Sequence, residues 1–301
     1  MFKKILFATS ASPACDNAAK VSFDLAQKND AKLYTLHVLG VPSRGFSTTV
    51  TDLRSGEEET VDADYRDWVM EELTTTYAAQ LADYEKTALE LAVGVPATEI
   101  LRFARKEGVD LIVMGANTRD DDPESARSRS IVGRTMEKVA RLAKCPVLIV
   151  NRPCTTCWKL FSNIVYCTDF SPAADNAFEF ARTTAEEIGA KLNIFHAFDM
   201  TSSKMGLFPS QSDIERQLES AQKKIDERYV SKLKDYDNYD VEIWEGTPYV
   251  EILKFAREKQ ADLIIMAHHT AEVPAEDAEL GSTIEQVVVR SACPVASVSR
   301  A

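Results

Sequence analysis

The sequence predicts an α/β protein of two tandem doubly wound domains, each a five-stranded parallel sheet with helices on both faces. Two observations lead to this prediction. The chain consists of two copies of one repeat, because residues 5–26 align with 164–185 and residues 95–115 align with 247–267. Within each copy, short strongly apolar runs alternate with helix-length amphipathic segments. This alternation is typical of folds in which helices cover a parallel sheet on both sides.

The spacing of the repeat sets the expected domain boundaries. The offset between matching residues falls from 159 in the first aligned segment to 152 in the second and 148 at the final Cys-Pro-Val stretches. A falling offset indicates shorter connections in the second copy, with the fold unchanged. We therefore expect domains at 1–152 and 160–301, joined by a linker at 153–159 that contains Cys154 and Cys157.

The apolar runs place the strands. Runs such as Leu-Ile-Val-Met are apolar on both faces, as expected for strands of a sheet that is covered on both sides. In the first copy the predicted strands are 4–8, 32–39, 88–93, 110–114 and 146–150. In the second copy they are 163–167, 191–197, 240–245, 262–266 and 294–298.

The segments between the strands have helical periodicity. After the first strand of each copy, apolar residues recur at the spacing of one helical face. They are Ala14, Ala18, Val21 and Leu25 in the first copy and Ala173, Ala177, Phe180 and Ala181 in the second. Ser12-Pro13 and Ser171-Pro172 precede these stripes, which predicts an N-cap serine followed by proline at the first helical position.

Composition and charge exclude several classes of protein. The formal net charge of −12 indicates an acidic surface that repels nucleic-acid backbones and anionic membranes. No apolar run approaches the roughly 18 residues of a membrane span, and the apolar stretch at 5–8 is shorter than a signal-peptide core of roughly 7 residues or more. Six cysteines are too few for a disulfide scaffold. We therefore expect free thiols and a cytoplasmic protein without a nucleic-acid or membrane partner.

A ligand is expected at the carboxyl edge of each sheet. In open α/β sheets, ligands bind outside the carboxyl ends of the strands, where the strand order reverses. The first strand ends in Thr168-Asp169 in the second copy and in Thr9-Ser10 in the first. A later helix of the second copy begins at Gly281-Ser282-Thr283, where backbone N–H groups, hydroxyl groups and the helix dipole could hold an anion.

Both copies resemble domains of the universal stress protein family, over nearly the whole chain. The motifs are Thr-Asp-x-Ser after the first strand (Thr-Ser-x-Ser in the first copy), Ile-Leu-x-x-Ala followed by Asp-Leu-Ile-x-Met, and Gly-(Ser/Thr)-x-x-Glu-x-Val followed by Cys-Pro-Val. The resemblance implies the adenine nucleotide alpha hydrolase-like fold and a role in the stress response. It also implies that the domains pair antiparallel through their last strands, 147–150 and 295–298, as an intrachain pseudo-dimer. Association of two chains into a homodimer stays open.

Nucleotide-binding members of the family resemble one another in a Gly-2x-Gly-9x-Gly-(Ser/Thr) motif. This motif holds the phosphates and ribose of ATP, and the aspartate of the first strand lies at the adenosine end. The second copy keeps Asp169 and Gly281-Ser282-Thr283 but has Ala267 and Thr270 at the first two glycine positions. A methyl group and a β-branched side chain there narrow the approach of phosphate to the backbone. AMP or ADP should therefore be tolerated better than ATP.

The second copy is the better candidate for an adenine nucleotide site. Its candidate residues are Thr168, Asp169, Ala197, Met266, Ala267, His269, Gly281, Ser282 and Thr283. The degenerate first site, where Ser10 replaces the aspartate and Arg134 the hydroxyl residue, consists of Thr9, Ser10, Val38, Gly115, Gly133, Arg134 and Thr135. The resemblance implies ATP, ADP or AMP as ligand, with or without Mg, and no ligand if both sites are degenerate.

Two other functions stay open. The lost glycines favour a protein–protein interaction module that no longer binds nucleotide. Cys154 and Cys157 form a C-x-x-C pair that could act as a redox or zinc sensor, although a second pair is absent from the sequence. Motifs of P-loop, dinucleotide-binding, zinc protease and serine hydrolase sites are also absent, so we expect no catalytic residues and at most weak ATP hydrolysis.

Overall fold

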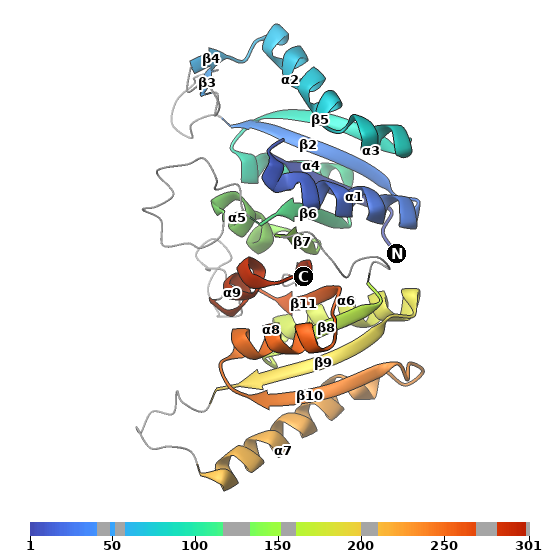
Figure 1. Cartoon of the computed structure of the whole chain (residues 1–301), viewed down its shortest axis with the longest axis vertical. Coiled ribbons are helices and arrows are strands. Elements are labelled where there is room, and N and C mark those ends of the chain that lie inside the picture. Colours follow the sequence, from blue (N-terminus) through green and yellow to red (C-terminus); the bar gives the residue numbers. More distant parts are fainter. Residues whose placement is uncertain are drawn as a thin grey trace. The chain divides into compact units, whose positions relative to one another are not determined.

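The structure, a computed structural model, describes residues 1–40, 49–51, 58–116, 133–151, 161–199, 210–268 and 282–298, with only the backbone described at 49–51, 58–60 and 282. The chain divides into two compact units, Met1–Asn151 and Arg152–Ala301. Each unit has its own parallel sheet with helices packed against it (Figure 1), and the units are described one at a time.

The sheet of the first unit consists of parallel strands in the order β7-β6-β1-β2-β5. These strands are β1 (Lys4–Thr9), β2 (Lys32–Gly40), β5 (Thr87–Gly94), β6 (Leu111–Gly115) and β7 (Val147–Val150). The chain runs outward from β1 through β2 to β5 and then returns to the other side of β1 for β6 and β7. The strand order therefore reverses between β1 and β6, which is where a ligand crevice is expected.

Helices cover both faces of this sheet. The connections between parallel strands are right-handed, so the connections on the two sides of the reversal place their helices on opposite faces. One face carries α1 (Asp16–Asn29) and α2 (Ala63–Thr76), and the other carries α4 (Pro96–Glu107) and α5 (Arg134–Leu142). The shorter elements are the 3₁₀ turn η1 (Pro13–Cys15), the helix α3 (Ala78–Asp83) and the antiparallel hairpin of β3 (Thr49–Thr51) and β4 (Glu58–Thr60).

The second unit repeats this plan. Its parallel strands are in the order β12-β11-β8-β9-β10, with the reversal between β8 and β11. They are β8 (Asn163–Cys167), β9 (Lys191–Phe198), β10 (Tyr239–Glu245), β11 (Leu263–Ala267) and β12 (Val295–Val298). The helical elements are α6 (Pro172–Ile188), α7 (Gln211–Arg228), the 3₁₀ turn η5 (Val230–Lys232), α8 (Pro248–Glu258) and α9 (Ser282–Arg290).

The predicted fold class is confirmed: two doubly wound α/β units follow one another along the chain. The ends of the ten predicted strands differ from the observed ends by at most one residue. Strands of this kind are predictable because their apolar residues are buried from both faces, as the fully buried runs of β7 and β12 illustrate.

One predicted helix cap is confirmed, and two other details of the helices differ from the prediction. Ser171 caps α6 as expected, since its Oγ accepts a hydrogen bond of 3.2 Å from the N–H of Ala174. Ser12 does not cap α1, because the 3₁₀ turn η1 precedes that helix and the Ser12 hydroxyl bonds to Ser10 instead. In α6 the buried aromatic residue is Phe178, whereas the predicted Phe180 is only half-buried.

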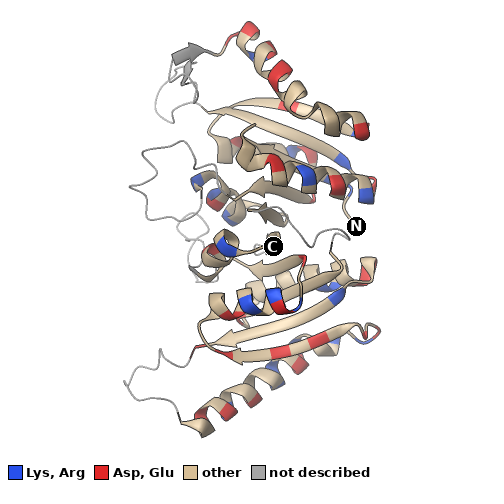
Figure 2. Cartoon of the chain, viewed as in Figure 1, with Lys and Arg blue, Asp and Glu red and all other residues tan. Residues whose placement is uncertain are grey.

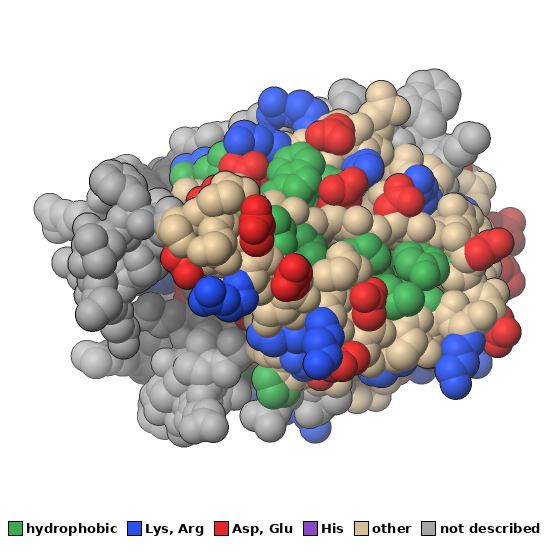
Figure 3. Space-filling model, turned by 90° about the horizontal axis from the view of Figure 1, so that it is seen from below, with side chains coloured by type: hydrophobic (Ala, Val, Ile, Leu, Met, Phe, Trp, Pro, Cys, Tyr) green, Lys and Arg blue, Asp and Glu red, His purple; other side chains and the backbone are tan. Residues whose placement is uncertain are grey.

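Charged residues lie mostly on the helices and on the outer strand β10, while the central strands carry almost none (Figure 2). Figure 3 views the second unit from the end that carries α7, and there the hydrophobic side chains form small groups between charged ones. Such mixing is normal for a solvent-facing helix. Within the described segments, no helix is both long and apolar enough to cross a membrane.

Candidate functional site

The carboxyl edge of the second sheet brings together residues that end β8, β9 and β11. The N–H of Thr168 donates to the carbonyl of Phe195 at 3.0 Å, which sets the end of β8 beside β9. Met266, buried in β11, pairs in register with the last residue of β8 on the other side. Thr168, Ala197 and Ala267 therefore stand on neighbouring strands at one edge.

Thr168 is buried, with 6% of its surface exposed. Its hydroxyl shares a hydrogen bond of 2.7 Å with the hydroxyl of Tyr229 and accepts another, of 3.0 Å, from the backbone N–H of Phe170. Tyr229 directly follows α7 and is fully buried. The Thr168 side chain therefore ties the end of β8 to the end of α7.

Asp169 is an exposed carboxylate at this edge. Its Oδ1 accepts a hydrogen bond of 2.9 Å from the backbone N–H of Ser171, which closes a tight turn. Phe170 lies between them in the left-handed region, with a φ of 63°. Among the described residues, Oδ2 of Asp169 accepts no hydrogen bond. The turn thus leaves one carboxylate oxygen available to a ligand.

Groups from β9 and α7 enclose Phe170. Its ring centroid lies 4.4 Å from that of His196, and the Nζ of Lys224 lies 5.2 Å from the same centroid. The Nδ1 of His196 donates to the carbonyl of Thr168 at 2.8 Å. Burial lowers the pKa of His196; the Thr168 carbonyl opposes this change and Lys224 reinforces it. His196 is therefore a neutral hydrogen-bond donor near pH 7.

Further candidate residues belong to β11 and α9. Ala267 is half-buried at the end of β11. The helix α9 begins at Ser282, and Thr283 is half-buried in its first turn. His269 and Gly281 lie outside the described residues.

The first unit builds the same turn from matching residues. Thr9 Oγ1 lies 2.6 Å from the hydroxyl oxygen of Tyr77 and accepts a hydrogen bond of 2.9 Å from the N–H of Ala11. The Nδ1 of His37 donates to the carbonyl of Thr9 at 3.0 Å. Ala11 has a left-handed φ of 57°. The two units therefore share one hydrogen-bond pattern at the end of their first strands.

Reasoning from the sequence missed the two tyrosines of this pattern. Tyr77 and Tyr229 follow helices α2 and α7, whose sequences differ. A signal was nevertheless present, because the tyrosines match each other at the offset of 152 that relates the second pair of aligned segments. Burial raises the pKa of Tyr77 to about 12, so its hydroxyl group stays protonated at neutral pH.

Other side chains at the first edge differ from those of the second. Ser10 replaces the carboxylate, and its Oγ lies 2.9 Å from Ser12 Oγ and 3.3 Å from Cys15 Sγ. Gly115 has a packing role, since a Cβ there would lie 3.2 Å from the carbonyl oxygen of Ala14. Of the remaining candidates, Arg134 is exposed, and the half-buried ones are Val38, Gly133 and Thr135.

Four cysteines lie within the described residues as free thiols, and these are Cys15, Cys145, Cys167 and Cys293. Burial raises the pKa of Cys145 and that of Cys293 to about 11, which makes both thiols poor nucleophiles. Within the described part of the chain, no three potential metal-ligating side chains cluster together. Cys154 and Cys157 lie outside that part.

Comparisons with known proteins agree on one family. The model of the Universal stress protein family matches the chain twice, at residues 1–151 and 160–299. The chain is 30% identical over 163 residues to universal stress protein MJ0531 of Methanocaldococcus jannaschii, which covers 51% of this chain and 84% of that protein. It is 31% identical over 154 residues to universal stress protein YxiE of Bacillus subtilis, and this alignment covers 50% of this chain and 100% of that protein. A crystal structure of a universal stress protein from Archaeoglobus fulgidus has the same fold, with a TM-score of 0.63, 22% identity and coverage of 99% of this chain and 96% of that chain.

Proposed function

The chain belongs to the universal stress protein family, with two domains of the family in tandem, and on this premise we propose that it binds an adenine nucleotide at the carboxyl edge of the second sheet. The nucleotide would serve as a signal or as a stabilising ligand of a stress-response protein. We place the protein in the cytoplasm, because its described cysteines are free thiols. The proposal assigns no catalytic residue.

The observation that carries this proposal is the geometry of Asp169. The carboxylate is exposed where the strand order reverses, and its own turn engages only Oδ1 among the described residues. A carboxylate oxygen in that position can accept hydrogen bonds from the hydroxyl groups of a ribose or from the amino group of an adenine. Since the turn already holds the side chain in place, little conformational freedom is lost on binding.

The phosphate groups of the nucleotide would lie at the start of α9. Backbone N–H groups in the first turn of a helix have no partner within the helix, and the helix dipole favours an anion there. Ser282 and Thr283 are the first two residues of this turn. Ala267 ends β11 and carries a methyl group where a glycine would allow closer approach, which favours a nucleotide with few phosphates.

The first unit is proposed to bind nucleotide more weakly or not at all. Ser10 offers a neutral hydroxyl that is already engaged with Ser12 and Cys15, so it is a weaker acceptor than the carboxylate of Asp169. Arg134 is exposed at the first position of α5, where the second unit has a serine.

A protein–protein interaction module is the second candidate function. Ala267 in one unit and Ser10 in the other favour it, because each departs from the residue expected of a nucleotide site. Pairing of the two units through their last strands remains a prediction of the family resemblance, and so does a sensor built on Cys154 and Cys157.

The test of nucleotide binding uses the purified full chain. Mass spectrometry of the denatured protein would identify any nucleotide that it carries, and calorimetric titration of the stripped protein with AMP, ADP and ATP would count the sites. We expect one site per chain, with AMP or ADP bound at least as tightly as ATP. An absence of heat with all three nucleotides would favour the interaction module instead.

A further inference from the structure

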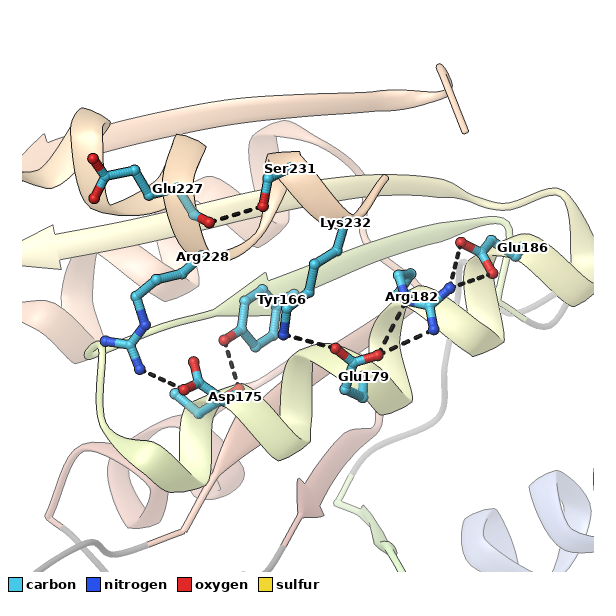
Figure 4. A network of polar contacts seen from close by, with 10 residues as sticks. Tyr166, Asp175, Glu179, Arg182, Glu186, Glu227, Arg228, Ser231 and Lys232 are labelled. Carbon is cyan, nitrogen blue, oxygen red and sulfur yellow. Dashed lines mark hydrogen bonds and ion pairs between the residues drawn. The ribbon is translucent and has the colours of Figure 1, made fainter. Parts of the chain in front are cut away.

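Two ion pairs fasten α7 and η5 to α6 in the second unit (Figure 4). The Nη2 of Arg228 lies 2.5 Å from Oδ2 of Asp175, and the Nζ of Lys232 lies 2.9 Å from Oε1 of Glu179. Asp175 and Glu179 are one helical turn apart on α6, and Arg228 and Lys232 have the same spacing along the chain. We call these two pairs the α6–α7 ladder.

Arg228 differs from the rest of the ladder because it also reaches the candidate site. Its Nη1 donates to the carbonyl of Phe170 at 2.5 Å. The next residue, Tyr229, shares its hydrogen bond with Thr168. The end of α7 therefore holds the turn at 168–171 at two points, on either side of Asp169.

Arg228 adds support to the turn. Phe170 is a bulky residue in the left-handed region, a backbone conformation that persists only when surrounding contacts over-determine it. Without the guanidinium group, the carbonyl of Phe170 would lose this hydrogen bond, and the turn would keep its left-handed residue, as the first unit does at Ala11, but with fewer contacts to fix its position. Because Asp169 precedes Phe170 directly, its carboxylate would move with the turn.

The first unit keeps the tyrosine but not the arginine. At the offset of 152, Thr76 stands where the second unit has Arg228. At the offset of 159, Lys20 stands where the second unit has Glu179. The ladder is therefore a feature of the second unit, and it occurs in the unit that also has the exposed carboxylate.

We propose that Arg228 is a positioning residue for the nucleotide site of the second unit. Its guanidinium group fixes the turn so that the carboxylate of Asp169 faces the ligand. It also links the packing of α7 against the turn to the affinity for the ligand. Coupling of this kind is reciprocal, so a ligand bound at Asp169 stabilises the contact between α7 and the turn. This inference rests on the proposed function.

The first experiment compares Arg228→Gln with Lys232→Gln in the full chain. Both variants lose one pair of the ladder, but only the first loses a contact with the turn. We expect affinity to fall about tenfold in Arg228→Gln, the usual effect of losing a charge-assisted hydrogen bond, and to stay within about twofold in Lys232→Gln. Equal losses in the two variants would show that the ladder acts only on overall stability and would overturn the proposal.

Adenosine and ATP serve as the two probes in calorimetric titrations. A positioning residue affects both ligands equally, because it acts through Asp169 at the adenosine end. A loss confined to ATP would mean that Arg228 contacts phosphate directly, which also overturns the positioning role. Arg228→Lys keeps the charge but cannot bond to Phe170 and Asp175 through two separate nitrogens. Its affinity is expected to lie between that of the wild type and that of Arg228→Gln.

Hydrogen exchange of the backbone amides of Phe170 and Ser171 tests, without any ligand, whether Arg228 holds the turn. We expect faster exchange in Arg228→Gln and unchanged exchange in Lys232→Gln. If the wild-type chain binds none of adenosine, AMP, ADP and ATP, the proposed function fails, while faster exchange in Arg228→Gln would still support the hold of Arg228 on the turn. Unchanged exchange in Arg228→Gln would overturn that hold whether or not nucleotide binds.

Discussion

The hydroxyl groups of Thr168 and Tyr229 lie 2.7 Å apart, and those of Thr9 and Tyr77 repeat this contact at 2.6 Å. In each unit the bond joins the end of the first strand to the residue that follows a long helix. The repeat therefore extends from the backbone to buried polar side chains. The two edges differ in the exposed side chains around this shared bond, and the four predictions below concern residues at these edges.

Asp169→Ala should weaken nucleotide binding by about 1 to 3 kcal/mol, the range for deleting a charged hydrogen-bond partner. Ser10→Ala is the matched control in the first unit, and it should leave affinity unchanged because Ser10 bonds within its own turn. Calorimetric titration of the two variants side by side makes the comparison. A loss in Ser10→Ala alone would assign the site to the first unit, and equal losses would contradict the preference for the second unit.

Ala267→Gly should strengthen the binding of ATP more than that of AMP. Removing the methyl group at the end of β11 lets phosphate approach the backbone more closely, and relief of crowding is worth up to about 1 kcal/mol. Gly115 occupies the matching position in the first unit, so the substitution copies a residue that the repeat already contains. Titration of wild type and variant with AMP and ATP measures the ratio, and an equal gain for both ligands would place the phosphates elsewhere.

Tyr77 should make the free energy of unfolding fall at alkaline pH. Burial raises its pKa to about 12 in the folded protein, against 10.0 for an exposed tyrosine. Below pH 10 both states keep the proton, so the contribution to stability is complete there. Between pH 10 and 12 the unfolded state ionises first, and the free energy of unfolding decreases.

Urea denaturation at pH 9 and pH 11 measures this effect of Tyr77. Tyr77→Phe should show a smaller loss between the two pH values than the wild type, although it is less stable at pH 9 by about 1 kcal/mol. An identical loss in both proteins would mean that Tyr77 ionises as easily folded as unfolded.

Acidification should destabilise the chain through His37 and His196. Burial lowers the pKa of both side chains, and the carbonyls of Thr9 and Thr168 only partly oppose this change. As the pH falls through about 6.5, the unfolded state therefore binds a proton before the folded state does, and the free energy of unfolding decreases.

Urea denaturation at pH 7 and pH 5 tests the histidines. The double variant His37→Gln, His196→Gln should lose less stability between the two pH values than the wild type. Lys224→Gln should raise the pKa of His196, because Lys224 is a cation that disfavours the protonated ring, and NMR titration of the ring would record this change. A pKa of His196 at or above 6.5 in the wild type would contradict the burial argument.

Most of the fold could be predicted because it depends on residues close together in the chain. Apolar runs such as β7 and β12 are buried in full, so their composition alone marks them as strands. The position of Asp169 at a carboxyl edge also followed from the strand pattern, since parallel strands end together at one edge.

The sequence by itself determined the repeat, the strands and the edge at which Asp169 stands. These features follow from the spacing of apolar residues within short segments of the chain. Only the tertiary structure decided that Phe178 rather than Phe180 fills the core and that Arg228 reaches Phe170. The bond from Arg228 to Phe170 spans 58 positions along the chain. Contacts of that range depend on how α7 and α6 pack against the sheet, which is set by the fit of whole surfaces and not by any local pattern.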